Sequence, residues 1–342
     1  MKKKPLPLVA PPPKKRKSFP YLLFACTLFC AWLVWKSLTP VIPQFAQPPR
    51  LYSNPSREDL RLTLLSAIKS SQTAIYLSMF GLSDPAILTA LAKKIQNHVP
   101  TTIYYDPTGS PNIRSVLRGA TIHPILQSGF MHQKILVLDD ELIFMGSANF
   151  TTQSLKMHDN LVVGFRSPKI AQFLEEKMPD SSGYIRAFVG GQDVELWLLP
   201  DPKGHALADL KKKIRSAAWS LRVALFTLTH KGLTEELIRA KKRGVAVTVV
   251  IDLHSALGAS ASSVETLKAA GVQVLQAQGP QLLHHKFVYI DEHTLVTGSA
   301  NWTQAAFTKN SDSLLTLHNL NGEQKTFMKQ LWRRLQTSAK AI

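Results

Sequence analysis

The chain has 342 residues, of which 45% are hydrophobic, enough for one large domain or two ordinary ones with a real core. This composition argues against a disordered chain. The formal net charge of +18 favours anionic partners such as phospholipid head groups, nucleic acid or phosphate esters.

The number and position of the cysteines exclude two kinds of stabilising site. Both cysteines, Cys26 and Cys30, lie in an apolar stretch near the N-terminus. The rest of the chain therefore has neither a disulfide framework nor a cysteine-based metal site. A core of this size does not need disulfides, so their absence is compatible with an oxidising compartment.

The N-terminal region has the pattern of a membrane-targeting segment. A basic tail, residues 1–18, precedes an uncharged run from Phe19 to Trp35. Residues 19–38 are therefore predicted to be a transmembrane signal anchor or a cleaved signal peptide, with the anchor favoured because the basic lead is long. Residues 39–56 form a proline-rich linker. This interpretation makes the remainder membrane-anchored and extracytoplasmic, or secreted if the segment is cleaved.

The rest of the chain repeats one order of elements. In the first half, apolar patterns predict a strand over 74–80, a helix over 86–96 and a strand over 101–105. The second half repeats this order, with a strand over 221–228, a helix over 233–242 and a strand over 245–252. Such alternation predicts an α/β fold with two similar halves, each a mixed sheet flanked by helices, related by a pseudo-twofold axis.

The boundaries follow from the repeat. The first half spans residues 57–165 and the second spans 206–342, with folded structure expected to begin near Arg57. Residues 166–205, rich in Gly, Pro and Asp, are expected to connect the halves, with an edge strand over 194–199 as an alternative.

Two copies of one motif occupy equivalent places in the halves. Each copy has a histidine, a lysine two residues later, an aspartate and a Gly-Ser-x-Asn turn, and the copies lie 152 residues apart with identical internal spacing. A single His-x-Lys pattern would be weak evidence for an active site, whereas the duplicated set of residues is strong evidence. The first copy comprises His132, Lys134, Asp139, Ser147 and Asn149, and the second comprises His284, Lys286, Asp291, Ser299 and Asn301.

These residue types suit phosphate chemistry. In an extended segment, a histidine and a lysine two residues apart point to the same face, so an imidazole and an ammonium can address one ligand. The turn adds a hydroxyl and an amide. Two such sets can neutralise the non-bridging oxygens of a phosphate and stabilise a pentacoordinate transition state. No metal or cofactor is therefore predicted.

With these two motifs the chain resembles a known family. The residues match the twice-repeated HKD motif of the phospholipase D superfamily, and the resemblance covers most of residues 57–320. It implies a two-step displacement at phosphorus. One histidine forms a phosphohistidine, and the other protonates the leaving alcohol and then activates water or an acceptor alcohol.

The resemblance also implies a role for each motif residue. His132 and His284 share the nucleophile and acid–base roles, and the family's order favours His132 as the nucleophile. The residues implied to hold phosphate or lie beside it are Lys134, Lys286, Asn149, Asn301, Ser147 and Ser299. Asp139 and Asp291 belong to the catalytic motif, although their position at strand ends indicates that they set the loop.

An acidic residue usually follows the Gly-Ser-x-Asn turn in this family and orients a catalytic histidine. Asp312 is expected to do so for His284, and Asp159 is its counterpart in the first half, shifted by one residue. A metal site using His284, His285 and Asp291 is disfavoured because the Lys286 ammonium would face the metal cation.

The predicted function is a phosphodiesterase that acts on phospholipid, because a membrane segment would bring the site to a bilayer. A membrane-anchored, metal-independent endonuclease is the alternative, since a basic protein also suits nucleic acid. An inactive phosphate-binding relative is disfavoured because both motifs are intact. No protein partner is predicted. The sequence does not distinguish hydrolysis from phosphatidyl transfer, because both reactions pass through the same phosphohistidine.

Overall fold

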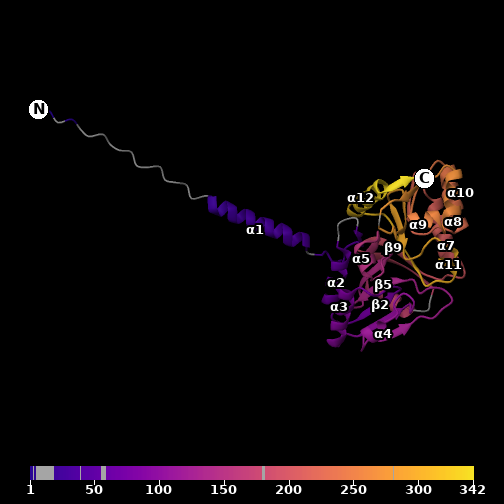
Figure 1. Cartoon of the computed structure of the whole chain (residues 1–342), viewed down its shortest axis with the longest axis horizontal. Helices are drawn as coiled ribbons and strands as arrows, with labels where there is room; N and C mark the ends of the chain where they lie inside the picture. The colour runs from indigo at the N-terminus through magenta and orange to yellow at the C-terminus, as the bar shows by residue number, and fades with distance from the viewer. Residues whose placement is uncertain (3, 5–18, 39, 55–58, 179–181, 280) are drawn as a thin grey trace. The chain divides into compact units, whose positions relative to one another are not determined.

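The computed structural model describes all residues except 3, 5–18, 39, 55–58, 179–181 and 280 (Figure 1). The chain forms two compact units, Met1–Val41 and Ile42–Ile342. The described part of the first unit contains the helix α1 (Phe19–Leu38), and the second unit contains the sheets and the remaining helices. The predicted basic tail lies largely outside the described residues.

The N-terminal segment requires a correction. Within the described residues, no helix is both long enough and apolar enough to cross a membrane. The uncharged run from Phe19 to Trp35 is at the short end of the about 17–25 consecutive apolar residues that span a bilayer core. The prediction of an anchored extracytoplasmic or a secreted protein, which depended on this segment, is therefore wrong.

Two mixed sheets share one strand order. The first contains β1 (Arg50–Tyr52), β2 (Ile75–Met79), β3 (Thr101–Tyr105), β4 (Thr121–Pro124), β5 (Lys134–Leu138), β6 (Leu142–Gly146) and β7 (Val162–Arg166). The second contains β8 (Gly183–Val189), β9 (Gln192–Leu198), β10 (Ser220–Leu225), β11 (Ala246–Ile251), β12 (Gln273–Ala277), β13 (Lys286–Ile290), β14 (Thr294–Gly298), β15 (Ser313–Leu317) and β16 (Ala339–Ala341). Their orders are β1-β7-β6-β5-β2-β3-β4 and β16-β12-β11-β10-β13-β14-β15-β9-β8.

The pairing directions also correspond. In the first sheet β2, β3 and β4 are parallel neighbours, and β2, β5, β6 and β7 are antiparallel neighbours. In the second sheet β10, β11 and β12 are parallel, and β10, β13, β14 and β15 are antiparallel. The predicted fold, two similar α/β halves with mixed sheets, is therefore confirmed.

Helices flank both sheets. The first half contains α2 (Leu60–Ser70), α3 (Pro85–Gln96), α4 (Ile113–Val116), α5 (Thr152–Lys156) and α6 (Pro168–Lys177). The second contains α7 (His205–Arg215), α8 (Lys231–Lys242), α9 (Leu253–Leu257), α10 (Ala261–Ala269), α11 (Gln304–Thr308) and α12 (Gly322–Thr337). Figure 1 shows α8 and α10 side by side, and these helices contact each other.

The central strands are buried on both faces, which explains their uninterrupted apolar sequences. In β5, Ile135 and Val137 join a core cluster built from both halves, whereas Leu136 and Leu138 join a cluster of the first half. Because successive side chains of a strand point to opposite faces, one face of the sheet packs under its own helices. The other face contributes to the core shared with the second half.

Short edge elements extend the predicted boundaries. β1 lies within the range predicted to be linker and pairs antiparallel with β7. β8 and β9 form a hairpin within the predicted connector. β9 pairs with β15, so it lies inside the second sheet and not at an edge. β1, with three residues, is too short for its periodicity to be recognised from the sequence.

Asp139 and Asp291 occupy the tight turns after β5 and β13. Their φ angles are 53° and 49°, in the left-handed region that tight hairpin turns use. Asp139 Oδ1 accepts hydrogen bonds from the backbone N–H groups of Gln72 and Thr73, at 2.8 and 2.7 Å. Asp291 accepts equivalent bonds from residues 218–220. Both carboxylates therefore tie a hairpin to the loop that precedes the central strand.

This position bears on their assignment to the catalytic set. β5 begins at Lys134 and ends before Asp139, and β13 separates Lys286 from Asp291 in the same way. At about 3.3 Å per residue, five residues put each aspartate roughly 16 Å from the motif lysine. The structure thus places both carboxylates away from the histidines and gives them a structural function.

We expect Asp139→Ala and Asp291→Ala to lower the free energy of unfolding by about 2–4 kcal/mol, because each removes a charged acceptor of several backbone hydrogen bonds. Urea denaturation measures this loss, with the exposed Glu265→Ala on α10 as the control. Activity per folded molecule should be retained. A variant of wild-type stability that lacks activity would contradict this assignment.

Candidate active site

Each motif segment is held by the opposite half of the molecule. The His132 backbone N–H donates to the Ser311 carbonyl oxygen at 2.8 Å, and the His284 N–H donates to the Asp159 carbonyl oxygen at 2.9 Å. Isolated parallel bridges join residue 131 to Ser311 and Asp159 to residue 283. The two motifs therefore meet in one site, to which both halves contribute.

The side chains cross over in the same way. His132 Nδ1 lies 2.8 Å from Asp312 Oδ1, and His284 Nδ1 lies 3.0 Å from Asn160 Oδ1. Asp312 and Asn160 are both fully buried. They occupy matched positions, 152 residues apart, at the starts of β15 and β7.

This geometry changes two expected pairings. Asp312 was expected to orient His284, but it contacts His132. The segment that precedes β15 pairs with the His132 segment of the first half and so brings Asp312 to that histidine. The first-half counterpart is Asn160 and not Asp159. The 152-residue offset of the motif leads directly to Asn160 and is the sequence signal that identifies it.

The motif serines hold the partners of the histidines. Ser147 Oγ donates to Asn160 Oδ1 at 2.9 Å, and Ser299 Oγ donates to Asp312 Oδ1 at 2.7 Å. Each serine oxygen also accepts a backbone N–H at the start of the next strand, at 3.0 and 2.9 Å. Both serines are completely buried. Their hydroxyls therefore act behind the histidines, through Asn160 and Asp312.

The glycine before each serine permits this contact. A Cβ atom on Gly146 would lie 2.2 Å from the Leu161 carbonyl oxygen, and one on Gly298 would lie 2.1 Å from the Ser313 carbonyl oxygen. No side chain fits at such distances. The motif therefore needs glycine where β6 and β14 turn against the neighbouring strand.

These bonds fix which ring nitrogen is free. Asn160 Nδ2 donates to the Ser154 carbonyl oxygen at 2.9 Å, so Asn160 Oδ1 is the acceptor and His284 Nδ1 carries the hydrogen. The Asp312 carboxylate can only accept, so His132 Nδ1 also carries a hydrogen. In both neutral rings Nε2 has a free lone pair for chemistry.

Two buried lysines supply positive charge. Lys134 Nζ and Lys286 Nζ donate to the carbonyl oxygens of the motif histidines at 2.7 and 2.8 Å. Each Nζ also lies 5.1 Å from the centre of an aromatic ring, Phe80 or Phe226. Burial lowers the pKa of Lys134 to about 7, and burial together with Lys134 lowers the pKa of Lys286 well below its usual range. A bound anion would stabilise both ammonium groups.

Burial and the charges of the two lysines also act on the histidines. Burial and the Lys134 ammonium lower the pKa of His132, while Asp312 opposes this shift. Burial, Lys286 and Lys134 lower the pKa of His284 well below its usual range. Each lysine therefore acts on the histidine of the other motif as well as on its own.

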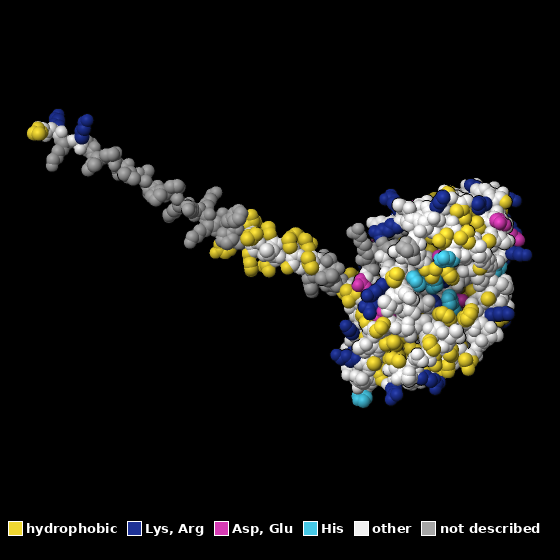
Figure 2. Space-filling model, in the orientation of Figure 1, with side chains coloured by type: hydrophobic (Ala, Val, Ile, Leu, Met, Phe, Trp, Pro, Cys, Tyr) yellow, Lys and Arg dark blue, Asp and Glu magenta, His cyan; other side chains and the backbone are white. Residues whose placement is uncertain are grey.

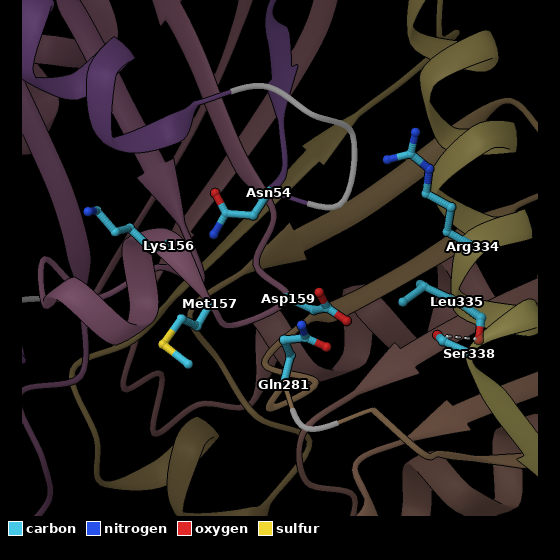
Figure 3. A pocket seen from close by; sticks show the side chains of 8 residues that line it. All are labelled: Asn54, Lys156, Met157, Asp159, Gln281, Arg334, Leu335 and Ser338. Atoms are coloured by element: carbon cyan, nitrogen blue, oxygen red, sulfur yellow. Dashed lines mark hydrogen bonds between the residues drawn. The ribbon is translucent and has the colours of Figure 1, made fainter.

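The other predicted residues are less directly involved. Gly81 N–H donates to Asn149 Oδ1 at 3.3 Å, and Asn149 and Asn301 are both half-buried. Their contact with phosphate stays a prediction. The Asp159 side chain lines a cavity of about 280 Å³ (Figure 3). Burial there raises the pKa of Asp159 to about 6. The described contacts of Asp159 with a motif segment are made by its backbone.

Two further aspartates, which lie outside the repeated motif, position the motif segments. Asp106 Oδ2 accepts the backbone N–H of Met131 at 3.2 Å, and Asp252 Oδ2 accepts that of Leu283 at 3.2 Å. Met131 and Leu283 directly precede the motif histidines. The available signal was an aspartate immediately after each of the matched strands β3 and β11.

Comparison with known proteins agrees with this geometry. The family model described as "Cardiolipin synthase, PLD-like domain" matches residues 64–180 and 210–337. Human mitochondrial cardiolipin hydrolase is 36% identical over 144 residues, covering 40% of this chain and 57% of that protein. A phospholipase D of Rickettsia conorii is 28% identical over 110 residues, covering 32% of this chain and 54% of that protein.

A solved structure shows the same fold over nearly the whole chain. The phosphatidylserine synthase of Haemophilus influenzae superposes with a TM-score of 0.71 at 12% identity, covering 90% of each chain. The protein has the two-half fold and the doubled histidine–lysine site of a phosphodiesterase family. It belongs to the phospholipase D superfamily. Its relatives support an enzyme of this family, although the matched part spans little more than half of the curated relatives.

We expect Asp106→Asn and Asp252→Asn to lower kcat/KM by about 10- to 100-fold, because a neutral side chain holds the histidine-bearing segment less firmly. A soluble chromogenic phosphodiester measures this effect. Asp59→Asn, which alters a helix cap on α2, serves as the control and should retain activity. Unchanged kcat/KM in both variants would exclude the positioning function.

Proposed function

We propose that the protein is a phospholipase D-type phosphodiesterase that acts on phospholipid through a phosphohistidine intermediate. The observation that carries the proposal is the pair of histidines with engaged Nδ1 atoms and free Nε2 atoms, next to two buried lysines. Relatives named cardiolipin hydrolase and phospholipase D support a phospholipid substrate.

In the first step, the substrate phosphate lies against Lys134 and Lys286. His132 Nε2 attacks phosphorus, the bond from phosphorus to the leaving alcohol oxygen breaks, and that oxygen takes the Nε2 proton of His284. Asp312 favours His132 as the nucleophile, because a carboxylate 2.8 Å from Nδ1 stabilises the positive ring of a phosphorylated imidazole.

In the second step, His284 acts as a base and the phosphohistidine is broken down. His284 Nε2 takes a proton from water or an acceptor alcohol, whose oxygen attacks phosphorus. The bond between phosphorus and His132 Nε2 then breaks, and the ring returns to its neutral form. Water gives hydrolysis and an alcohol gives phosphatidyl transfer, so the acceptor alone separates the two activities.

Exposed apolar side chains beside the site favour lipid over nucleic acid. Figure 2 shows histidine side chains gathered on one face, with hydrophobic side chains around them. Phe130 is 55% exposed and packs on Phe80, whose ring centre lies 5.5 Å from that of His132. Leu126 and Met157 are exposed as well. Acyl chains suit such surroundings, whereas a nucleic-acid backbone calls for basic side chains.

Full-length protein should release head group from mixed phospholipid vesicles in the presence of EDTA, and His132→Gln or His284→Gln should lower this rate by about 10⁴-fold or more. His205→Gln, at the exposed start of α7, is the control. The same proteins are tested on single- and double-stranded DNA and RNA. Cleavage of nucleic acid alone would identify a nuclease, and silence on every substrate would identify an inactive relative.

Trapping experiments distinguish the two histidines. His284→Gln, incubated with a diester that has a p-nitrophenyl leaving group, should accumulate phosphorylated protein, because this leaving group needs no acid while the second step lacks its base. Intact-protein mass spectrometry and peptide mapping would locate the phosphoryl group on His132. A phosphoryl group found on His284 in the His132→Gln variant, and none on His132 in the first variant, would reverse the roles.

A further inference from the structure

One element of the site is not duplicated between the halves. The crossing backbone bonds, the buried serines and the free Nε2 atoms are all repeated. The Nδ1 partner differs, because His132 faces the Asp312 carboxylate and His284 faces the Asn160 amide. The two histidines therefore sit in similar geometry with different charge.

This difference matters for proton binding. A carboxylate next to Nδ1 stabilises an imidazolium ion by charge, whereas an amide oxygen offers only a dipole. Asn160 Oδ1 also accepts the Ser147 hydroxyl, as Asp312 Oδ1 accepts the Ser299 hydroxyl, so the charge of the acceptor is what distinguishes the two sites. A positive charge on His284 therefore gains little from its direct partner.

The other groups around His284 oppose a proton as well. The titratable groups that act on it are Lys286, Lys134, His132 and His158, and each lowers its pKa. The Phe226 ring packs on it at 5.3 Å between ring centres. Asp252 and Asp312 act on Lys286, and Asp312 bonds directly to His132. In the free protein these surroundings disfavour a proton on His284.

The proposed reaction nevertheless requires a proton on His284 Nε2 in its first step. A phosphate between the two lysines would supply the negative charge that Asn160 does not. We propose that Asn160 keeps His284 neutral until a phosphate anion binds, so that binding itself loads the proton that His284 donates to the leaving alcohol. Asn160 is thus a positioning residue that couples anion binding to proton uptake.

The proton balance closes over one cycle. His284 Nε2 takes one proton from solvent when the anion binds and passes it to the leaving oxygen in the first step. It takes another from water or the acceptor alcohol in the second step, and returns it to solvent when the product leaves. The role as donor rests on the proposed function, whereas proton uptake on anion binding does not.

Calorimetry of the full-length protein tests the coupling. Sulfate is the probe, because it is tetrahedral and its charge is constant near neutral pH. Titrations in buffers of different ionisation enthalpy count the protons taken up per sulfate bound. Wild type should take up about one proton more than either Asn160→Asp, which holds the proton before binding, or His284→Gln, which cannot hold it. The two lysines contribute in all three proteins.

Asp159→Asn is the matched control, because it changes the neighbouring residue, whose pKa is raised to about 6, without altering the contact to His284. It should take up as many protons as wild type. Equal uptake by wild type, Asn160→Asp and His284→Gln would overturn the proposal, as would a lack of sulfate binding by wild type. Thermal unfolding verifies that Asn160→Asp is folded, and the His284→Gln comparison stands independently of it.

The activity of the same proteins separates this inference from the proposed function. Sulfate binding needs no turnover, so a protein inactive on phospholipid could still show the extra proton. An active enzyme without it would retain the proposed function and lose the coupling. In an active enzyme, Asn160→Asp should move the alkaline limb of the kcat/KM profile to higher pH, whereas Asp159→Asn should leave it in place.

Discussion

The site depends on the exchange of backbone hydrogen bonds between the halves. Each histidine-bearing segment pairs with the start of a strand in the other half, His132 with Ser311 and His284 with Asp159. That register delivers Asp312 and Asn160 to the two Nδ1 atoms. Neither half contains a complete histidine and its partner. The core cluster shared by both halves keeps this register, since separation would expose buried apolar surface together with buried polar groups.

Burial then determines the electrostatics. Two lysines and two histidines are removed from water in a small volume, and Asp312 is the carboxylate bonded directly to one of the histidines. Among the described residues, Asp106 and Asp252 offset part of the lysine charge from the ends of β3 and β11. Burial lowers the pKa of all four basic groups, and the neighbouring positive charges lower it further for His132, His284 and Lys286. Such a site is preorganised for an anion, and for the further charge that develops on phosphorus oxygens during transfer.

Aspartates at strand ends serve two distinct purposes here. Asp139 and Asp291 adopt positive φ and bind loop amides at one end of the central strands, where they support the hairpins. Asp106 and Asp252 follow β3 and β11 and bind the amides that precede the motif histidines. The motif aspartates thus stabilise the scaffold, and two aspartates outside the motif position the chemistry. Motif membership by itself does not reveal which end of a strand a residue occupies.

The sequence by itself determined the doubled α/β fold and the two sets of histidine and lysine, because apolar periodicity and a fixed offset of 152 residues are local, one-dimensional properties. It did not determine which half supplies the partner of each histidine, since Asp312 reaches His132 only through strand crossing between the halves. The three-residue strand β1 and the N-terminal helix were also misjudged, because brief or borderline apolar runs do not define their surroundings. The strand over 194–199 was expected at an edge, because the sequence does not show that β9 pairs with both β8 and β15. Only the tertiary structure decided that Asn160 and Asp312 give two similar histidines unequal charge, because that depends on contacts between residues far apart in the chain.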